Sequence, residues 1–155
     1  MTILVRRAGM EDLDGILAIE RAGFGRWAWD RNLFAGYLST CGPLFLVAES
    51  RRKVAGYSIT WISRGLIRRR AELVSIAVDP AMQGKGVADA LLARTLSGLR
   101  RRGIHRLGLT VRVTNDRARA FYEKHGFRKV RRIPRYYEDG EDAFALRLDL
   151  PPQRR

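Results

Sequence analysis

The segment 71–99, AELVSIAVDPAMQGKGVADALLARTLSGL, constrains the fold of this chain more than any other stretch. Residues 71–78 form an almost continuous run of β-favouring residues, which is the pattern of a strand buried on both faces. From position 87 onward, apolar residues recur at the spacing of an amphipathic helix: Val87, Leu91, Leu92, Leu96 and Leu99. A strand that leads through a turn into such a helix indicates a mixed α/β fold.

The turn before this helix contains residues that disfavour a helix start. Glycine costs up to about 1 kcal/mol in a helix, and the positive end of the helix dipole repels a cation such as Lys85. The first N–H groups of a helix have no partners within the helix. If Gly84 and Gly86 leave these groups bare and Ala88 keeps the next turn slim, an anion can approach them. The turn therefore predicts a phosphate-binding site.

Two better-known phosphate motifs do not fit this turn. A P-loop requires Ser or Thr after its Gly-Lys pair, but Gly86 occupies this position. A dinucleotide fingerprint requires a small residue three positions after Gly86, where Asp89 stands. A glycine turn without any ligand remains the alternative.

The rest of the chain predicts strands and helices in the order β-α-α-β-β-β-α-β-α-β-β, a mixed sheet with helices on both faces. The predicted strands cover residues 2–8, 43–50, 54–63, 71–78, 105–113, 127–133 and 141–150. The other predicted helices cover residues 10–24, 29–38 and 116–125. We expect one domain over residues 1–150 and a loose tail at 151–155, because no linker or repeat divides the chain.

The composition limits the possible classes of protein. Thirty Lys and Arg against sixteen Asp and Glu give a net charge of +14, which would attract nucleic acid, the ribosome or acidic peptides. The alternative is a genome rich in arginine codons, since no nucleic-acid motif accompanies the charge. A single cysteine, Cys41, excludes an internal disulfide, and no Cys/His cluster predicts a metal site. Without an apolar signal core or a membrane-length apolar run, we expect a cytoplasmic protein that does not bind membranes.

Three motifs together resemble the GNAT family of N-acetyltransferases. Gln83, Gly86 and Ala88 fit its Q/R-x-x-G-x-G/A signature, and the similarity continues through LTVRVTNDRARAFYEKHGFRKV and RYYEDGEDAFALRL, up to Leu148. The second half is most similar to the RimI-like ribosomal-protein-alanine N-acetyltransferases. The resemblance implies the GNAT fold, a mostly antiparallel sheet of about six or seven strands. It also implies acetyl-CoA as the acetyl donor, and the α-amine of a protein or peptide as the acceptor.

The resemblance assigns the cofactor site to the segment around the glycine turn. It implies that backbone amides of residues 84–89 hold the pyrophosphate and that the edge of the strand at residues 76–78 pairs with the pantetheine arm. Asn115 matches an asparagine that contacts this arm, and it can also cap the helix that follows. The complete expected set is Ile76, Ala77, Val78, Gln83, Gly84, Lys85, Gly86, Val87, Ala88, Asp89 and Asn115.

The resemblance also implies catalytic residues, with one departure. Tyr122 matches the family's general acid, although it could simply belong to the buried side of its helix. RimI-like enzymes carry a glutamate where this chain has Thr110, which cannot accept a proton at neutral pH. We therefore expect Glu72 to act as the base, at the position used by histone acetyltransferases of the same family. A solvated edge role for Glu72, with proton loss through water, is the alternative.

The weak base favours an α-amine substrate. At pH 7 about one-tenth to one-sixth of α-amino groups are neutral, against about one lysine in 2,500, a difference of about 3.5 kcal/mol. We expect Trp27, Trp29, Tyr136 and Tyr137 to line the peptide site, with ordinary packing as the alternative for the tryptophans. Two other functions stay open: a GNAT enzyme for a small-molecule amine, and a non-catalytic acyl-CoA-binding or ribosome-associated module. The sequence leaves open a monomer or a homodimer.

Overall fold

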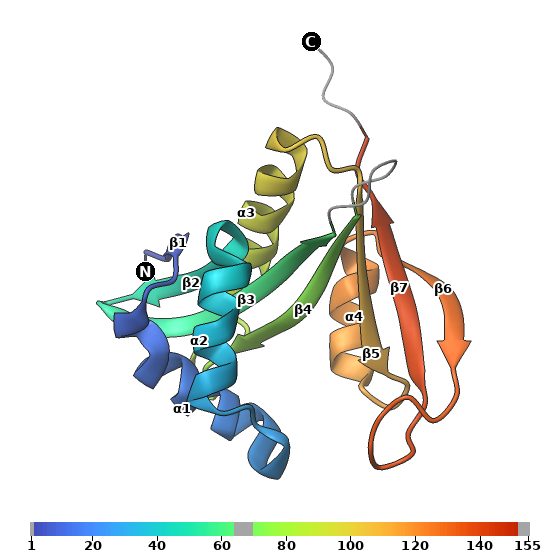
Figure 1. The fold of residues 1–155 in the computed structure, drawn as a ribbon, viewed down its shortest axis with the longest axis horizontal. Helices are drawn as coiled ribbons and strands as arrows, with labels where there is room; N and C mark the ends of the chain where they lie inside the picture. The colour runs from blue at the N-terminus through green and yellow to red at the C-terminus, as the bar shows by residue number, and fades with distance from the viewer. Residues whose placement is uncertain (1, 64–69, 152–155) are drawn as a thin grey trace.

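The computed structural model describes residues 2–63 and 70–151, and it contains seven strands and four α-helices among them (Figure 1). The strands are β1 (Leu4–Arg7), β2 (Phe45–Ser50), β3 (Lys53–Ser63), β4 (Arg70–Val78), β5 (Arg106–Arg112), β6 (Arg128–Ile133) and β7 (Ala143–Asp149). The α-helices are α1 (Leu13–Phe24), α2 (Arg31–Thr40), α3 (Val87–Arg101) and α4 (Asp116–Lys124). The predicted order of elements is confirmed. Most of the expected tail, residues 152–155, lies outside the described residues.

All seven strands form one sheet in the order β1-β2-β3-β4-β5-β7-β6. Every neighbouring pair is antiparallel except β4 and β5, which are parallel. The mostly antiparallel sheet that the family resemblance implied is therefore confirmed. The parallel pair at its centre joins the two halves of the sheet, β1–β4 and β5–β7.

Helices cover both faces of the sheet, as predicted. Leu13, Ile16 and Leu17 of α1 are buried together with Phe34 of α2 against the inner strands of the first half. On the opposite face, α3 and α4 pack on β4, β5 and β7, with Leu92, Leu99 and Tyr122 among the buried side chains. The residues on the two faces alternate along the strands, because successive side chains of a strand point to opposite sides.

The two halves of the sheet separate at its centre. β4 and β5 pair only at Ala71–Leu107 and Glu72–Gly108, and beyond these residues the two strands diverge (Figure 1). As a result, residues 74–78 of β4 are only half-buried and Glu72 is exposed. The prediction of a strand buried on both faces was therefore wrong in part, because one face of the first half is exposed at Arg70 and Glu72, and residues 74–78 are only half-buried.

The start of α3 lies close to the sheet next to this separation. A Cβ at Gly56 of β3 would lie 2.8 Å from Val87 Cγ1 and 2.9 Å from the Ala77 carbonyl oxygen, so only glycine permits this approach. Val87 and Leu91 are buried there against Leu46 and Ala55. This contact fixes the first turn of α3 beside the diverging end of β4.

Candidate active site

The turn before α3 has the geometry of an anion site. Gly84 and Gly86 adopt left-handed φ values of 77° and 82°, which side chains rarely permit. A Cβ at either position would meet no atom within 4 Å, so the space in front of both residues is open. The first hydrogen bond of the helix runs from Ala90 N–H to the Gly86 carbonyl. The amides of residues 87–89 therefore have no earlier carbonyl of the helix to bind and are available to an anion.

Two polar side chains connect this turn to the start of α4. Gln83 Oε1 accepts a hydrogen bond of 2.5 Å from Arg117 of α4. Asn115 caps α4, since its side-chain oxygen accepts from the Ala118 N–H at 3.1 Å. The capping role considered for Asn115 is thus confirmed, and Gln83 and Asn115 lie at neighbouring helix starts. The structure brings both expected residues to the same end of the sheet.

The free edge of β4 lies beside the same turn. Ile76, Ala77 and Val78 pair with β3 on one side. On the other side no strand of the described residues pairs with them, because the pairing with β5 is confined to Ala71 and Glu72. An unpaired edge offers backbone N–H and C=O groups to an extended ligand. A thioester arm that carries amides could therefore add to β4 as a short strand.

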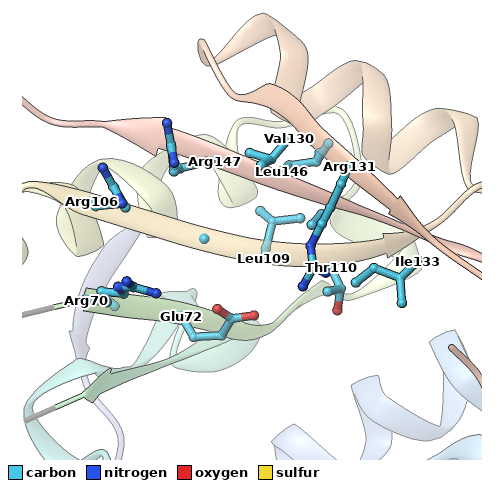
Figure 2. A pocket seen from close by; sticks show the side chains of 13 residues that line it. Arg70, Glu72, Arg106, Leu109, Thr110, Val130, Arg131, Ile133, Leu146 and Arg147 are labelled. Atoms are coloured by element: carbon cyan, nitrogen blue, oxygen red, sulfur yellow. The ribbon is translucent and has the colours of Figure 1, made fainter. Parts of the chain in front are cut away.

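Glu72 lines a hollow at the place where β4 and β5 still pair, next to Thr110 (Figure 2). The hollow has a volume of about 240 Å³ and lies over β4, β5, β7 and β6. Its floor passes over Gly108, where a Cβ would lie 3.3 Å from Glu72 Oε2. Partial burial raises the pKa of the Glu72 carboxyl. A carboxylate thus occupies the place next to the threonine that replaces the family's glutamate.

Tyr122 lies on the other face of the sheet. It is 8% exposed, and it packs against Phe121 and Phe127 in the core formed by α3 and α4. Burial raises the pKa of its phenol, so the group is protonated throughout the physiological range. The nearby Tyr137 raises this pKa further. The alternative that Tyr122 belongs to the buried side of its helix is confirmed, and its role as the general acid stays a prediction.

The segment between β6 and β7 brings Tyr137 over the end of β5. The Arg112 guanidinium lies 4.1 Å from the centre of the Tyr137 ring and binds Asp139 and Glu141 at 2.8 and 2.9 Å. Burial raises the pKa of Tyr137, and the neighbouring Thr110 partly offsets the rise. Tyr136 is 50% exposed and meets Tyr137 edge to face. Tyr137 therefore lies near both Thr110 and Tyr122, while Tyr136 lies farther out.

The two tryptophans of the other expected rim segment differ in environment. Trp27 is 42% exposed, and Arg26 stacks on its ring. Trp29 packs against Phe34 and Tyr37, at ring distances of 5.8 and 5.6 Å. The packing alternative therefore describes Trp29, and Trp27 remains available to a ligand.

A buried carboxylate binds the backbone of the segment that contains Trp29, and the sequence analysis assigned it no role. Glu20 of α1 is 2% exposed. It accepts a hydrogen bond of 2.6 Å from the Tyr57 hydroxyl and one of 3.1 Å from the Trp29 backbone N–H. The Tyr57 oxygen also lies 3.3 Å from Ser75 Oγ of β4. The only sequence signal was the position of Glu20 on the apolar side of α1.

A second polar contact also escaped prediction. Asp89 in the first turn of α3 lies 2.6 Å from His125 Nε2 at the end of α4, and Lys124 Nζ lies 3.9 Å away. Because a carboxylate would repel a pyrophosphate at this helix start, the Lys124 ammonium offsets part of its charge. Cys41 is buried and unpaired, and burial raises the pKa of its thiol, which is consistent with a bystander role. Among the described residues there is no group of His, Cys, Asp and Glu that could hold a metal ion, and no helix long and apolar enough to cross a membrane.

Known proteins are similar to most of this chain. An N-alpha-acetyltransferase of Sulfolobus acidocaldarius is 32% identical over 94% of this chain and 92% of its own length. The ribosomal protein bS18-alanine N-acetyltransferase of Escherichia coli is 38% identical over 90% of this chain and 92% of its own length. The crystal structure of the Escherichia coli ribosomal-protein-S18-alanine N-acetyltransferase is similar with a TM-score of 0.82 at 30% identity, covering 99% of this chain and 97% of that one. The profile of the acetyltransferase (GNAT) family matches residues 14–127, so the chain belongs to this family of acetyl-CoA-dependent N-acetyltransferases.

Proposed function

We propose that this protein transfers the acetyl group of acetyl-CoA to the α-amine at the N-terminus of a protein chain. The observation that carries the proposal is the separation of β4 from β5, which leaves a free strand edge beside the open glycine turn. The relatives support the choice of acceptor, since they include N-alpha-acetyltransferases and alanine N-acetyltransferases of a ribosomal protein. A ribosomal protein in the cytoplasm is therefore the first substrate to test.

The residues around the turn fit the donor. The amides of residues 84–89 would hold the pyrophosphate, and the Lys85 ammonium would add charge of the right sign from solvent. Ile76, Ala77 and Val78 would pair with the amides of the pantetheine arm, and Asn115, which caps α4, would contact this arm. When bound, acetyl-CoA supplies an acetyl group activated as a thioester.

Glu72 and Tyr122 divide the proton transfers between the two faces of the sheet. The Glu72 carboxylate removes a proton from the ammonium form of the acceptor, which leaves a neutral amine that can attack. The new N–C bond forms as the C–S bond breaks, and the Tyr122 phenol donates a proton to the departing sulfur. The proton that the new amide nitrogen still carries then passes to the phenolate, which restores Tyr122, and Glu72 returns its proton to solvent. Since β4 and β5 pair no further than Glu72 and Gly108, we propose that groups on both faces act on a substrate held between the two strands.

The chemistry of the base favours an α-amine over a lysine side chain. The raised pKa of Glu72 makes it a better base than an ordinary glutamate, but a lysine still costs about 3.5 kcal/mol more to deprotonate. Threonine at position 110 removes the second carboxylate that could help. Trp27, which follows α1, and Tyr137, which lies between β6 and β7, would contact the first residues of the substrate.

The test is the release of free thiol from acetyl-CoA in the presence of three acceptor classes: N-terminal peptides, lysine peptides with blocked N-termini, and polyamines. We expect the N-terminal peptides to react fastest. A clear preference for lysine peptides or polyamines would contradict the proposal and favour the alternative of a small-molecule or side-chain acetyltransferase. Acetyl-CoA binding without transfer to any of the three classes would instead support a non-catalytic module.

A further inference from the structure

The hollow beside Glu72 is built from two rows of side chains that cross the sheet. Glu72, Gly108 and Arg147 face each other across β4, β5 and β7. In the next row, Thr110 pairs with Ala145, and Ala145 pairs with Arg131 of β6. Paired residues in a sheet share a face, so both rows lie on the same side. The floor of the hollow is low because its middle positions are occupied by glycine and alanine.

Arginines surround this hollow. Arg70, Arg106, Arg131 and Arg147 all contribute to its lining, and Glu72 is the single acid among the lining residues (Figure 2). Arg106 and Arg147 lie 3.5 and 3.6 Å from Asp149, which also binds Arg128, so three arginines share one carboxylate. The hollow thus has an excess of positive charge.

The remaining two arginines have no such carboxylate. Within residues 2–63 and 70–151, no acidic group lies within ion-pair distance of Arg70 or Arg131. By contrast Arg128 and Arg132, on the same strand as Arg131, each bind an aspartate. Charges left without partners around a concave site attract an anionic ligand.

From this arrangement we infer that the hollow binds acidic side chains near the N-terminus of the substrate chain. The inference rests on the proposed function, because it places the acceptor amine next to Glu72. Arg147 lies two strands away from Glu72, at about 10 Å, which is the length of about three extended residues. The carboxylates would therefore belong to the second to fourth residues of the substrate.

The shape of the site favours a peptide over nucleic acid. Apolar side chains of Val130, Ile133 and Leu146 line the hollow between the arginines, and a peptide can use them for its own apolar atoms. The volume of about 240 Å³ suits a few side chains. A phosphate backbone is read by an extended row of cations on an open surface. This hollow instead combines cations with apolar walls beside a proposed catalytic group.

The test compares peptides that share one N-terminal residue and carry Glu, Gln or Lys at positions two to four. We expect kcat/KM to be about five- to tenfold higher for the Glu peptide than for the Gln peptide at low salt, and lowest for the Lys peptide. The difference should appear mainly in KM and shrink as salt is added. Arg131→Glu should reduce the Glu/Gln ratio to about one, or reverse it.

Arg101→Glu is the matched control. It makes the same change in net charge at an exposed position at the end of α3, away from the hollow, and should keep the wild-type ratio. Equal rates for all three peptides, or equal effects of the two variants, would overturn the inference and leave the proposed function intact. Failure to acetylate any peptide would remove the proposed function as well. A third outcome would also refute the inference: a random RNA competes with the peptides, Arg131→Glu abolishes this competition, and the enzyme shows no preference among the peptides. The hollow would then bind nucleic acid.

Discussion

Gly108 provides a direct way to test whether Glu72 is the catalytic base. Replacement by alanine puts a Cβ 3.3 Å from Glu72 Oε2, so the carboxylate must move by a few tenths of an ångström. Displacement of a catalytic group by about 1 Å can cost about a hundredfold in rate. Scaled to this shift, Gly108→Ala should lower kcat about four- to tenfold, or about 0.8–1.4 kcal/mol. The backbone should tolerate alanine, because Gly108 is not among the glycines with positive φ.

The assay is thiol release under saturating acetyl-CoA, with the melting temperature measured in parallel. Gly36→Ala in α2 is the matched control, since a Cβ there meets no atom within 4 Å, and it should keep the wild-type rate. If Gly108→Ala acts through Glu72, its effect should disappear in a Glu72→Gln background, where the base is already lost. A full rate for Gly108→Ala, or the same loss in both backgrounds, would show that the position of Glu72 does not control catalysis.

Three further changes have defined outcomes. Tyr122→Phe should lower kcat about a hundredfold with little change in the dissociation constant for acetyl-CoA, and an unchanged rate would exclude the phenol as the proton donor. Glu72→Gln should move the pH–rate profile toward alkaline pH. Even with its raised pKa, the Glu72 carboxylate of the native enzyme forms at a lower pH than the neutral amine does, and the variant lacks this base. An identical profile would leave the base unassigned. Gly86→Ala should weaken acetyl-CoA binding in calorimetry, because a φ of 82° costs alanine about 1–2 kcal/mol, and undiminished affinity would argue against the anion site.

The local patterns of the sequence were sufficient for the elements and for the turn before α3. Helical spacing placed the buried side of α3, and the unusual glycines located the open helix start. The same local reasoning was wrong in part for β4. Its apolar run is the pattern of a strand buried on both faces, but the exposure of Glu72 and the partial exposure of residues 74–78 depend on how the two halves of the sheet pack, which no local window contains.

Contacts between distant residues were also beyond local reasoning. The link from Glu20 to Tyr57 spans 37 positions, and that from Asp89 to His125 spans 36. A glutamate on the apolar side of a helix gives no hint of which buried donors will meet it. Similarly, Gly108 looks like an ordinary interruption of a strand, and only the register between β4 and β5 shows that it accommodates Glu72.

The hydrogen bond from the Trp29 backbone to Glu20 bears on how this enzyme could diversify. Because the donor is a main-chain amide, nineteen of the twenty standard residues at position 29 can supply it, and only proline cannot. The anchor of the segment is thus independent of the side chains that it displays. If Trp27 and its neighbours contact the substrate, as we propose, they can be exchanged during evolution or by design to accept new protein termini while the backbone hydrogen bond to Glu20 is kept.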